Sequence, residues 1–366
     1  MALKCGIVGL PNVGKSTLFN ALTSAKALAA NYPFATKEPN IGMITVPDER
    51  LEKLSQLVNP QKVLPTSMEI VDIAGLIKGA SEGEGLGNQF LANIREVDAI
   101  VHVVRCFVDD NVVHVDGNVD PVKDKDIIDT ELILKDIETL EKRLDKHKKG
   151  AKGGDKVEMK KVDVCNELMT HLSDGKPARA FDQEEESTAE LIEDMFLLTN
   201  KPILYVCNVD EDSVVNGNEL TKAFEAVIAG ENAEILLISA AIEADIAELD
   251  TADERMEFVK EMGLTEPGVN RVIQSCYKLL NLQTYFTAGE KEVRAWTIKV
   301  GTKAPGAAGV IHTDFEKGFI RAEVIAYDVF VELGSEAAVK EAGKMQVEGK
   351  EYVVQDGDVM HFRFNV

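Results

Sequence analysis

Eight residues near the start of the chain have the types and spacing of a phosphate-binding loop. Gly9 to Ser16 reads Gly-Leu-Pro-Asn-Val-Gly-Lys-Ser and matches the pattern Gly-x-x-x-x-Gly-Lys-Ser. In this pattern small residues let backbone N–H groups surround a triphosphate, the lysine neutralises its terminal charge, and the hydroxyl reaches magnesium. The alternative is a glycine-rich turn that fits by chance. The loop predicts that Lys15 and Ser16 hold a nucleoside triphosphate with Mg²⁺.

The segments around this loop have the periodicity that the motif requires. Residues 3–8 form an apolar run that predicts a strand, and residues 17–26 have helical apolar spacing. The positive end of such a helix would point at the phosphates. A strand, a phosphate loop and a helix in this order indicate an α/β nucleotide-binding domain.

Two later segments carry residue types that can sense a bound triphosphate. Thr36 lies in a loop with two prolines, where switch proteins place a threonine against magnesium and the terminal phosphate; a turn or capping threonine is the alternative. Residues 66–73 predict a strand that ends in Asp72, followed three positions on by Gly75. Asp72 can hold magnesium through water while the Gly75 N–H meets the terminal phosphate. We therefore expect Ser16, Thr36 and Asp72 around the metal.

The residue after Gly75 departs from the switch GTPases. It is Leu76, at the position where Ras-like enzymes carry a glutamine that orients the attacking water, and leucine cannot do this. Five glycines between Gly75 and Gly87 predict a segment that opens and closes with the nucleotide; an ordinary loop is the alternative. The sequence predicts a switch without the usual glutamine.

The segment expected to read the base also departs from the guanine-specific pattern. An apolar strand at 201–207 is followed by Asn208-Val209-Asp210-Glu211, where GTP-binding proteins carry Asn-Lys-x-Asp. The aspartate of that motif accepts two hydrogen bonds from guanine, and adenine does not offer that pair of donors. Because Val209 replaces the lysine and Glu211 the aspartate, base preference is predicted to move away from guanine.

Two more strands are predicted around these motifs. Residues 98–105 read as a buried parallel strand, in which His102 is expected to be a packed core histidine rather than a ligand. Residues 235–238 read as another strand. It ends in Ser239 and Ala240, a small-residue turn suited to backbone contact with a base.

Composition indicates a globular protein of more than one domain. Hydrophobic residues make up 45% and charged residues 28% of the 366 residues, and no apolar run approaches the length of a membrane span. The first twenty residues belong to the predicted strand, loop and helix, so we expect no cleavable signal, no membrane partner and a cytoplasmic location. Five scattered cysteines indicate neither a disulfide framework nor a zinc site.

One basic stretch interrupts an acidic chain. The net charge of −23 argues against non-specific nucleic-acid binding, and no DNA partner is expected. Residues 142–161, however, contain nine basic and three acidic residues. Apolar spacing predicts a long helix over 129–149 and a returning helix over 156–172, with Lys148, Lys149 and Lys152 at the tip. The tip predicts an RNA contact; a solvated lysine-rich helix end is the alternative.

The last part of the chain has a different composition. After a helical stretch over 254–281, strands are expected at 293–300, 306–314, 320–326 and 359–366, with a turn at 356–358. Roughly 85 residues are enough for a small independent α+β domain.

These motifs in this order resemble the YchF subfamily of Obg-related P-loop NTPases of the TRAFAC class, called Obg-like ATPases in eukaryotes. The resemblance extends over essentially the whole chain. It rests on Leu76 in place of glutamine, on Asn208 to Glu211 in place of Asn-Lys-x-Asp, and on Ile311-His312-Thr313-Asp314-Phe315 in a TGS-like terminal region.

The resemblance implies a fold of three parts. An α/β P-loop domain with a mainly parallel sheet would comprise residues 1–122 and 200–280. An α-helical, coiled-coil-like insertion would comprise residues 123–199. A C-terminal α+β domain of the β-grasp (TGS) type would comprise residues 281–366.

The resemblance also implies an activity and a set of site residues. It implies ATP hydrolysis with Mg²⁺, weaker GTP binding, and the ribosome with its RNA as partner. Carried over by position, the nucleotide-binding residues are Gly9, Asn12, Val13, Gly14, Lys15, Ser16, Thr17, Asn208, Val209, Glu211, Ser239 and Ala240, and the switch residues are Thr36, Asp72, Gly75 and Leu76. Lys15 would be catalytic. Asn12 is either a K⁺ ligand or a turn-stabilising asparagine, and His114 resembles a family histidine proposed to position the attacking water.

Three functions stay open on these grounds. The first is a slow ATPase whose nucleotide state sets its grip on the ribosome and so couples to translation. The second is an Obg-type GTPase that tolerates Glu211. The third is an RNA- or ribosome-binding scaffold in which turnover is incidental.

Overall fold

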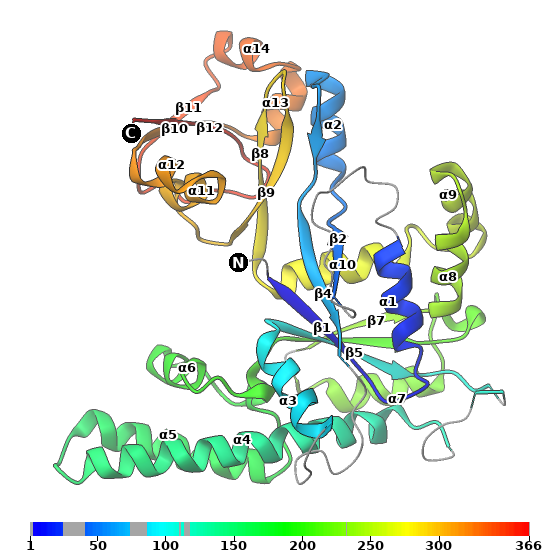
Figure 1. The fold of residues 1–366 in the computed structure, drawn as a ribbon, viewed down its shortest axis with the longest axis vertical. Helices are drawn as coiled ribbons and strands as arrows, with labels where there is room; N and C mark the ends of the chain where they lie inside the picture. The colour runs from blue at the N-terminus through cyan, green and yellow to red at the C-terminus, as the bar shows by residue number, and fades with distance from the viewer. Residues whose placement is uncertain are drawn as a thin grey trace. The chain divides into compact units, whose positions relative to one another are not determined.

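The chain divides into two compact units in the computed structural model, and each is described by itself (Figure 1). The structure describes residues 3–24, 41–73, 86–109, 111–112, 118–231 and 233–365. One unit comprises residues 1–43 and 69–272, and the other comprises residues 44–68 and 273–366. This division differs from the expected boundaries, which assigned residues 44–68 to the nucleotide-binding domain.

A six-stranded sheet with the order β2-β4-β1-β5-β6-β7 is the framework of the first unit. From β4 to β7 each strand runs parallel to its neighbour. The strands are β1 Lys4–Val8, β2 Ile41–Thr45, β4 Ser67–Asp72, β5 Ala99–Arg105, β6 Ile203–Asn208 and β7 Glu234–Ile238. Every residue of β5 and β6 is buried, as the continuous apolar runs predicted. The carboxyl ends of the parallel strands therefore share one edge.

Helices follow most of these strands. They are α1 Lys15–Ser24, α3 Leu86–Glu96, α7 Glu219–Ile228, α8 Ala240–Glu248, α9 Ala252–Glu261 and α10 Gly268–Leu279. The expected helical stretch over 254–281 is two helices rather than one. The break falls between them because Gly263 takes a left-handed φ of 72° and Pro267 disfavours helix in the residue before it.

The predicted helical hairpin is present and begins earlier than expected (Figure 1). Helix α4 spans Pro121–Ala151, and α5 returns over Lys156–Ser173. Asp120 caps α4 by accepting the Val122 and Lys123 N–H groups at 3.1 Å, and Pro121 suits the first turn. The hairpin has its own apolar core with α6 (Glu186–Glu193), which includes Ile133, Leu140, Leu144, Cys165, Leu168, Leu172 and Ile192.

A second six-stranded sheet, with the order β11-β10-β12-β8-β9-β3, is the framework of the other unit. Its strands are β3 Val63–Leu64, β8 Leu282–Ala288, β9 Val293–Lys299, β10 Phe319–Ile325, β11 Gln346–Glu348 and β12 Val359–Phe364. The pairs β8–β9, β10–β12 and β10–β11 are antiparallel. Helices α2 (Glu49–Val58), α13 (Tyr327–Leu333) and α14 (Glu336–Glu341) contribute to one of its apolar clusters, and the expected turn at 356–358 contains Gly357 with a φ of 91°.

The strand expected at 306–314 is wrong. The segment forms α11 (Ala304–Ile311) and α12 (Thr313–Lys317) instead. Pro305 suits the first turn of a helix, and Ala304, Ala307 and Ala308 bury one helical face completely. The glycines that suggested strand turns allow close packing, since a Cβ at Gly309 would fall 2.6 Å from the Glu316 carboxylate.

Two features of composition can be checked in the structure. All five cysteines are free and buried. Among the described residues, no helix is both long and apolar enough to cross a membrane.

Candidate functional site

The phosphate loop joins the carboxyl end of β1 to the first turn of α1. Asn12 and Gly14 take left-handed φ values of 63° and 91°, which turn the chain sharply. A Cβ at Gly9 would fall 2.7 Å from the Val103 carbonyl oxygen, so only glycine fits there. Helix α1 has no acidic residue in its first turn, so no fixed carboxylate there competes with an anion for the positive helix end.

Lys15 and Asp72 form an ion pair at this edge of the sheet. Asp72 lies opposite Ile7 in the register of β4 and β1, which brings its carboxylate beside the loop. The Lys15 ammonium donates to Asp72 Oδ1, and the two side chains remain 11% and 17% exposed. The lysine expected on the phosphate and the carboxylate expected near the metal are therefore brought together, and each neutralises the other.

Asn208 connects three segments of the site. Its side chain donates from Nδ2 to the Val13 carbonyl at 2.8 Å and accepts from the Ala240 N–H at 2.9 Å. It is 5% exposed, and a Cβ at Gly14 would fall 2.2 Å from its Nδ2. Asn208 was predicted to contact the base; in the structure its side chain fixes the phosphate loop against the turn before α8.

The neighbours of Asn208 differ in how much of their side chains a ligand can reach. The Val209 side chain is 2% exposed and its N–H donates to the Ile238 carbonyl at 2.8 Å, so it offers no surface to a base. Ser239 is not in a free turn: it is 1% exposed and caps α8. Glu211 is exposed and begins a short 3₁₀ turn, which Asp210 caps by accepting the Ser213 N–H at 2.9 Å. Of Asn208, Val209 and Glu211, which were predicted to contact the base, Glu211 is the residue whose side chain is exposed.

Four of the predicted site residues lie outside the described part of the chain. These are Thr36, Gly75, Leu76 and His114. The strand preceding His114 ends in Arg105, which was not among the predicted site residues. Arg105 is 1% exposed and donates to the carbonyls of Phe107, Asp109 and Val112 at 2.9–3.2 Å, so it fixes the backbone that leads into residues 113–117. An arginine at the end of a buried, mainly apolar strand was the signal that could have identified it.

Lys148, Lys149 and Lys152 are placed at the hairpin tip as predicted. They are exposed and, within the described ranges, form no ion pair. The hairpin closes beside them through His147 Nδ1 and Glu158 Oε2, which lie 2.7 Å apart. Cations are also favoured at a helix C-terminus, so their position agrees equally with the solvated-end alternative.

A buried ionic cluster lies where the insertion joins the parallel sheet. Lys125 of α4 lies 2.7 Å from Asp129 and 2.7 Å from Glu231, and Arg179 lies 2.7 Å from Glu231. Tyr205 of β6 donates to Glu231 at 3.1 Å. Burial opposes ionisation of Asp129, but Arg179 and Lys125 outweigh it and lower the pKa of Asp129. The charges were visible in the sequence, but their convergence was not.

His102 packs beside this cluster, as expected of a core histidine. It is 1% exposed, its ring lies 5.5 Å from that of Tyr205, and neither ring nitrogen has a hydrogen-bond partner among the described residues. Burial lowers the pKa of His102 to about 4. It is therefore neutral at physiological pH.

Two family models match parts of the chain. Residues 4–149 match the model described as 50S ribosome-binding GTPase. Residues 282–365 match the model named YchF-GTPase_C, described as a protein of unknown function.

Full-length relatives are similar to this chain from end to end. A protein of Bacillus subtilis (strain 168), named Ribosome-binding ATPase YchF, is 56% identical over 368 residues, and its namesake from Escherichia coli O157:H7 is 57% identical over 366 residues. Each alignment covers 100% of both chains. The solved structure of the Schizosaccharomyces pombe YchF GTPase is 40% identical, has a TM-score of 0.89, and covers 99% of this chain and 98% of its own.

Proposed function

This chain belongs to the YchF family of P-loop proteins, and from that premise we propose that it hydrolyses ATP and binds the ribosome, with its bound nucleotide controlling the binding. Support comes from full-length relatives that are named ribosome-binding ATPases. The fold supplies the phosphate loop, Lys15 and the positive end of α1 for the triphosphate.

The arrangement after β6 carries the choice of base. Asn208 is committed to Val13 and Ala240, and Val209 is buried, so the exposed carboxylate of Glu211 is left to meet the base. A carboxylate placed to accept two hydrogen bonds favours guanine, but Glu211 is one methylene longer than the aspartate of the guanine motif and starts a 3₁₀ turn. The displacement of its oxygens supports ATP as the preferred nucleotide.

A GTPase is the second candidate, because one similar solved structure and one matching family model are named GTPases. The relative from Schizosaccharomyces pombe is called a GTPase, and so is the family model matched by residues 4–149. Under this reading Glu211 would accept hydrogen bonds from guanine.

Mg²⁺ fits the residues at the loop. The Ser16 hydroxyl lies in the first turn of α1, and the Asp72 carboxylate lies at the end of the adjacent β4. Oxygen donors of this kind, one or two from the protein and the rest from phosphates and water, suit Mg²⁺. Ser16 and Asp72, with Thr36 as a third proposed ligand, would hold the ion, which neutralises charge on the phosphate oxygens when bound. Lys15 must then leave Asp72 for the phosphates.

Other assignments remain proposals of the family resemblance. Gly75 and Thr36 would form the switches, Leu76 would leave the attacking water unoriented, and His114 would position that water. The three carbonyl contacts of Arg105 support the last assignment, because they fix the backbone that enters the His114 segment. For Asn12 the left-handed φ of 63° supports the turn role, and K⁺ binding is the weaker proposal.

The ribosomal contact is proposed to include RNA. The cations of the hairpin tip are exposed and form no ion pair with any described residue, which supports a contact between Lys148, Lys149, Lys152 and phosphate groups. The ribosome as partner also supports a cytoplasmic location.

A competition titration tests the proposed function. A fluorescent ATP analogue is displaced by unlabelled ATP or GTP with Mg²⁺, and turnover is followed with and without ribosomes. We expect tighter ATP binding, and ATP turnover that ribosomes change. Tighter GTP binding that weakens in Glu211→Ala would overturn the ATPase and establish the GTPase. The matched control is Asp212→Ala, an exposed neighbour in the same turn.

A further inference from the structure

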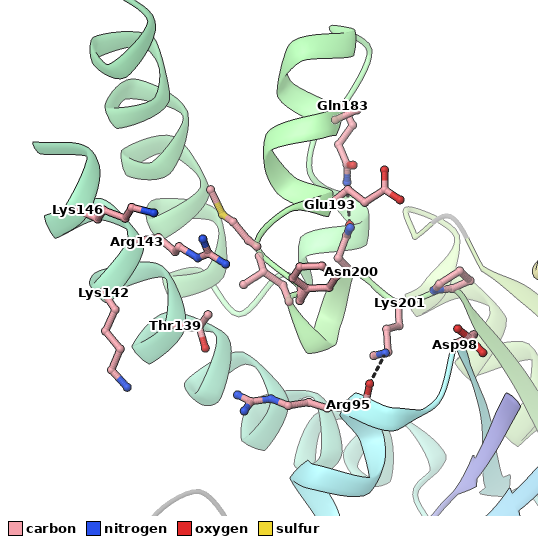
Figure 2. A pocket seen from close by; sticks show the side chains of 15 residues that line it. Arg95, Asp98, Thr139, Lys142, Arg143, Lys146, Gln183, Glu193, Asn200 and Lys201 are labelled. Atoms are coloured by element: carbon pink, nitrogen blue, oxygen red, sulfur yellow. Dashed lines mark hydrogen bonds between the residues drawn. The ribbon is translucent and has the colours of Figure 1, made fainter. Parts of the chain in front are cut away.

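A basic groove of about 1060 Å³ lies beside the helical insertion (Figure 2). Its floor includes Asp98, Lys201 and Pro202, which precede β5 and β6. These positions lie at the amino edge of the parallel sheet, whereas the phosphate loop lies at its carboxyl edge. The groove is therefore separate from the nucleotide site.

Five cations and two acids line this groove. The cations are Arg95, Lys142, Arg143, Lys146 and Lys201, and the acids are Asp98 and Glu193. A local excess of positive charge is unusual in a chain of net charge −23. The lining therefore attracts anions, although the molecule as a whole repels them.

Three of the five cations are available to a ligand. Arg143 donates to the Asp194 carbonyl at 3.0 Å, and Lys201 donates to the Arg95 carbonyl at 3.1 Å. Arg95, Lys142 and Lys146 are exposed and form no ion pair within the part of the chain that the structure describes. The acid Glu138 lies near Lys142 and Arg95, whose charges help to lower its pKa after the hydrogen bond from Lys135, and its ion pair is with Lys135.

Helical spacing aligns the cations along one wall. Thr139, Lys142, Arg143 and Lys146 follow one another on α4 at intervals that place them on one helix face. Figure 2 shows these side chains and Arg95, which comes from α3, around the same opening. The result is a row of positive charge with a further cation across from it, which suits a chain of phosphates better than a single one.

Phe196 adds an apolar side chain to the groove, and its backbone takes a conformation that is unfavourable for phenylalanine. Its side chain is 79% exposed, and its backbone takes a left-handed φ of 54°. A bulky side chain rarely adopts this conformation, and an exposed ring gains nothing from the core. Backbone strain of this kind is typical of functional positions. A free aromatic face beside a row of cations is the combination that binds unpaired nucleic-acid bases.

We propose that this groove binds a single-stranded segment of RNA, with Arg95, Lys142 and Lys146 on phosphates and Phe196 stacked on a base. A small-molecule site encloses most of its ligand, whereas this groove is open and carries five cations along its lining. Paired bases offer no free face to Phe196, so the ligand is single-stranded. The inference rests on the proposed ribosome binding and assigns its RNA contact to a surface other than the hairpin tip.

Fluorescence anisotropy with a labelled, mixed-sequence 12-nucleotide RNA tests the groove directly, without ribosomes or nucleotide. The first variant is Arg95→Gln/Lys142→Gln/Lys146→Gln. Its matched control is Lys176→Gln/Lys222→Gln/Lys260→Gln, which removes three exposed charges elsewhere in the same unit. The second variant is Phe196→Asn. Asparagine tolerates the left-handed backbone, so this variant keeps the fold and loses the ring.

We expect wild-type binding to weaken with salt. The triple groove variant should lose at least tenfold in affinity, and the slope of log K against log salt should fall by about two, at roughly 0.7 per lost contact on a single strand. Phe196→Asn should lose about tenfold with an unchanged slope, because stacking carries no charge. The control triple variant should bind like the wild type.

Every other outcome would contradict the proposed binding of RNA in the groove. Wild-type affinity in both groove variants, or no saturable RNA binding by the wild type at 50 mM salt, would exclude it. Lost ribosome cosedimentation with unchanged oligonucleotide affinity would indicate an acidic protein partner instead. The proposed function fails separately: wild type without ATP turnover or ribosome binding would reject it even where groove-dependent RNA binding persists.

Discussion

Two sets of ion pairs in the same unit have opposite designs. Lys15 and Asp72 form a single pair with both side chains partly exposed at the sheet edge. Lys125, Asp129, Arg179 and Glu231 form a connected cluster in which every side chain is at most 10% exposed. Both sets join residues that are distant in sequence, but only the first lies where a ligand can reach it.

This difference indicates which charged residues can exchange their ion-pair partner for a ligand. A lone, partly hydrated pair loses little when a phosphate and a metal replace its partners. Separating the ions of a buried cluster costs several kcal/mol of free energy, roughly 3–5 for one lost partner. Each ion left behind would be buried away from water without a counter-charge. We therefore expect the first pair to govern activity and the second to govern folding, and each prediction below tests that contrast.

The largest effect on stability is expected for Arg179→Met. The change removes one of the two cations that lie 2.7 Å from Glu231 and the one that lies 3.6 Å from Asp129, and it should destabilise the unit by about 3–5 kcal/mol, with nucleotide affinity nearly unchanged in the folded fraction. Urea unfolding followed by far-UV circular dichroism measures the loss. Lys222→Met, which removes an exposed pair with Glu219, is the control and should leave the transition where it is. Equal midpoints for Arg179→Met and wild type would contradict the contrast.

Lys15→Ala should show the reverse pattern. Removing the ammonium leaves the terminal phosphate without its neutralising charge, so turnover should fall about 100-fold or more. The unfolding midpoint should change little, because the pair with Asp72 is partly hydrated. Steady-state turnover and urea unfolding are measured on the same preparation. A large loss of stability would show that this pair is structural after all.

The smallest effect concerns pH. The pKa of His102 is lowered by burial to about 4, with Asp129, Lys125 and Arg179 facing the ring. Between pH 6.5 and pH 4 the unfolded chain binds a proton that the folded chain does not, so stability falls as pH falls. From pH 7 to pH 5 the loss attributable to this group is about 2 kcal/mol.

His102→Leu isolates this contribution. It removes the titrating group and two nitrogens that have no hydrogen-bond partner among the described residues, so the variant should lose about 2 kcal/mol less than the wild type over the same pH range. His361→Gln, at an exposed histidine, is the matched control. Parallel pH profiles for wild type and His102→Leu would show that His102 does not titrate differently on folding.

Local patterns predicted most of the first sheet and the phosphate loop. The apolar runs at 98–105 and 201–207 became buried strands because consecutive apolar residues fit a sheet covered on both faces. The segment 306–314 misled because its two glycines have poor intrinsic helix propensity, whereas in the folded unit Gly309 permits close packing against Glu316 of the next helix. The exposed Phe196 gave no signal, since an apolar residue in sequence is expected to be buried.

The sequence by itself determined the loop, because Asn12 and Gly14 reach left-handed backbone through their own chemistry and Lys15 begins the helix that follows. The tertiary structure decided which residues that are far apart in sequence contact one another. Asn208 contacts Val13 across 195 positions, Lys15 contacts Asp72 across 57, and the groove cations come from separate elements. Strand register and helix packing, which depend on the whole unit, set these contacts, and no local pattern encodes them.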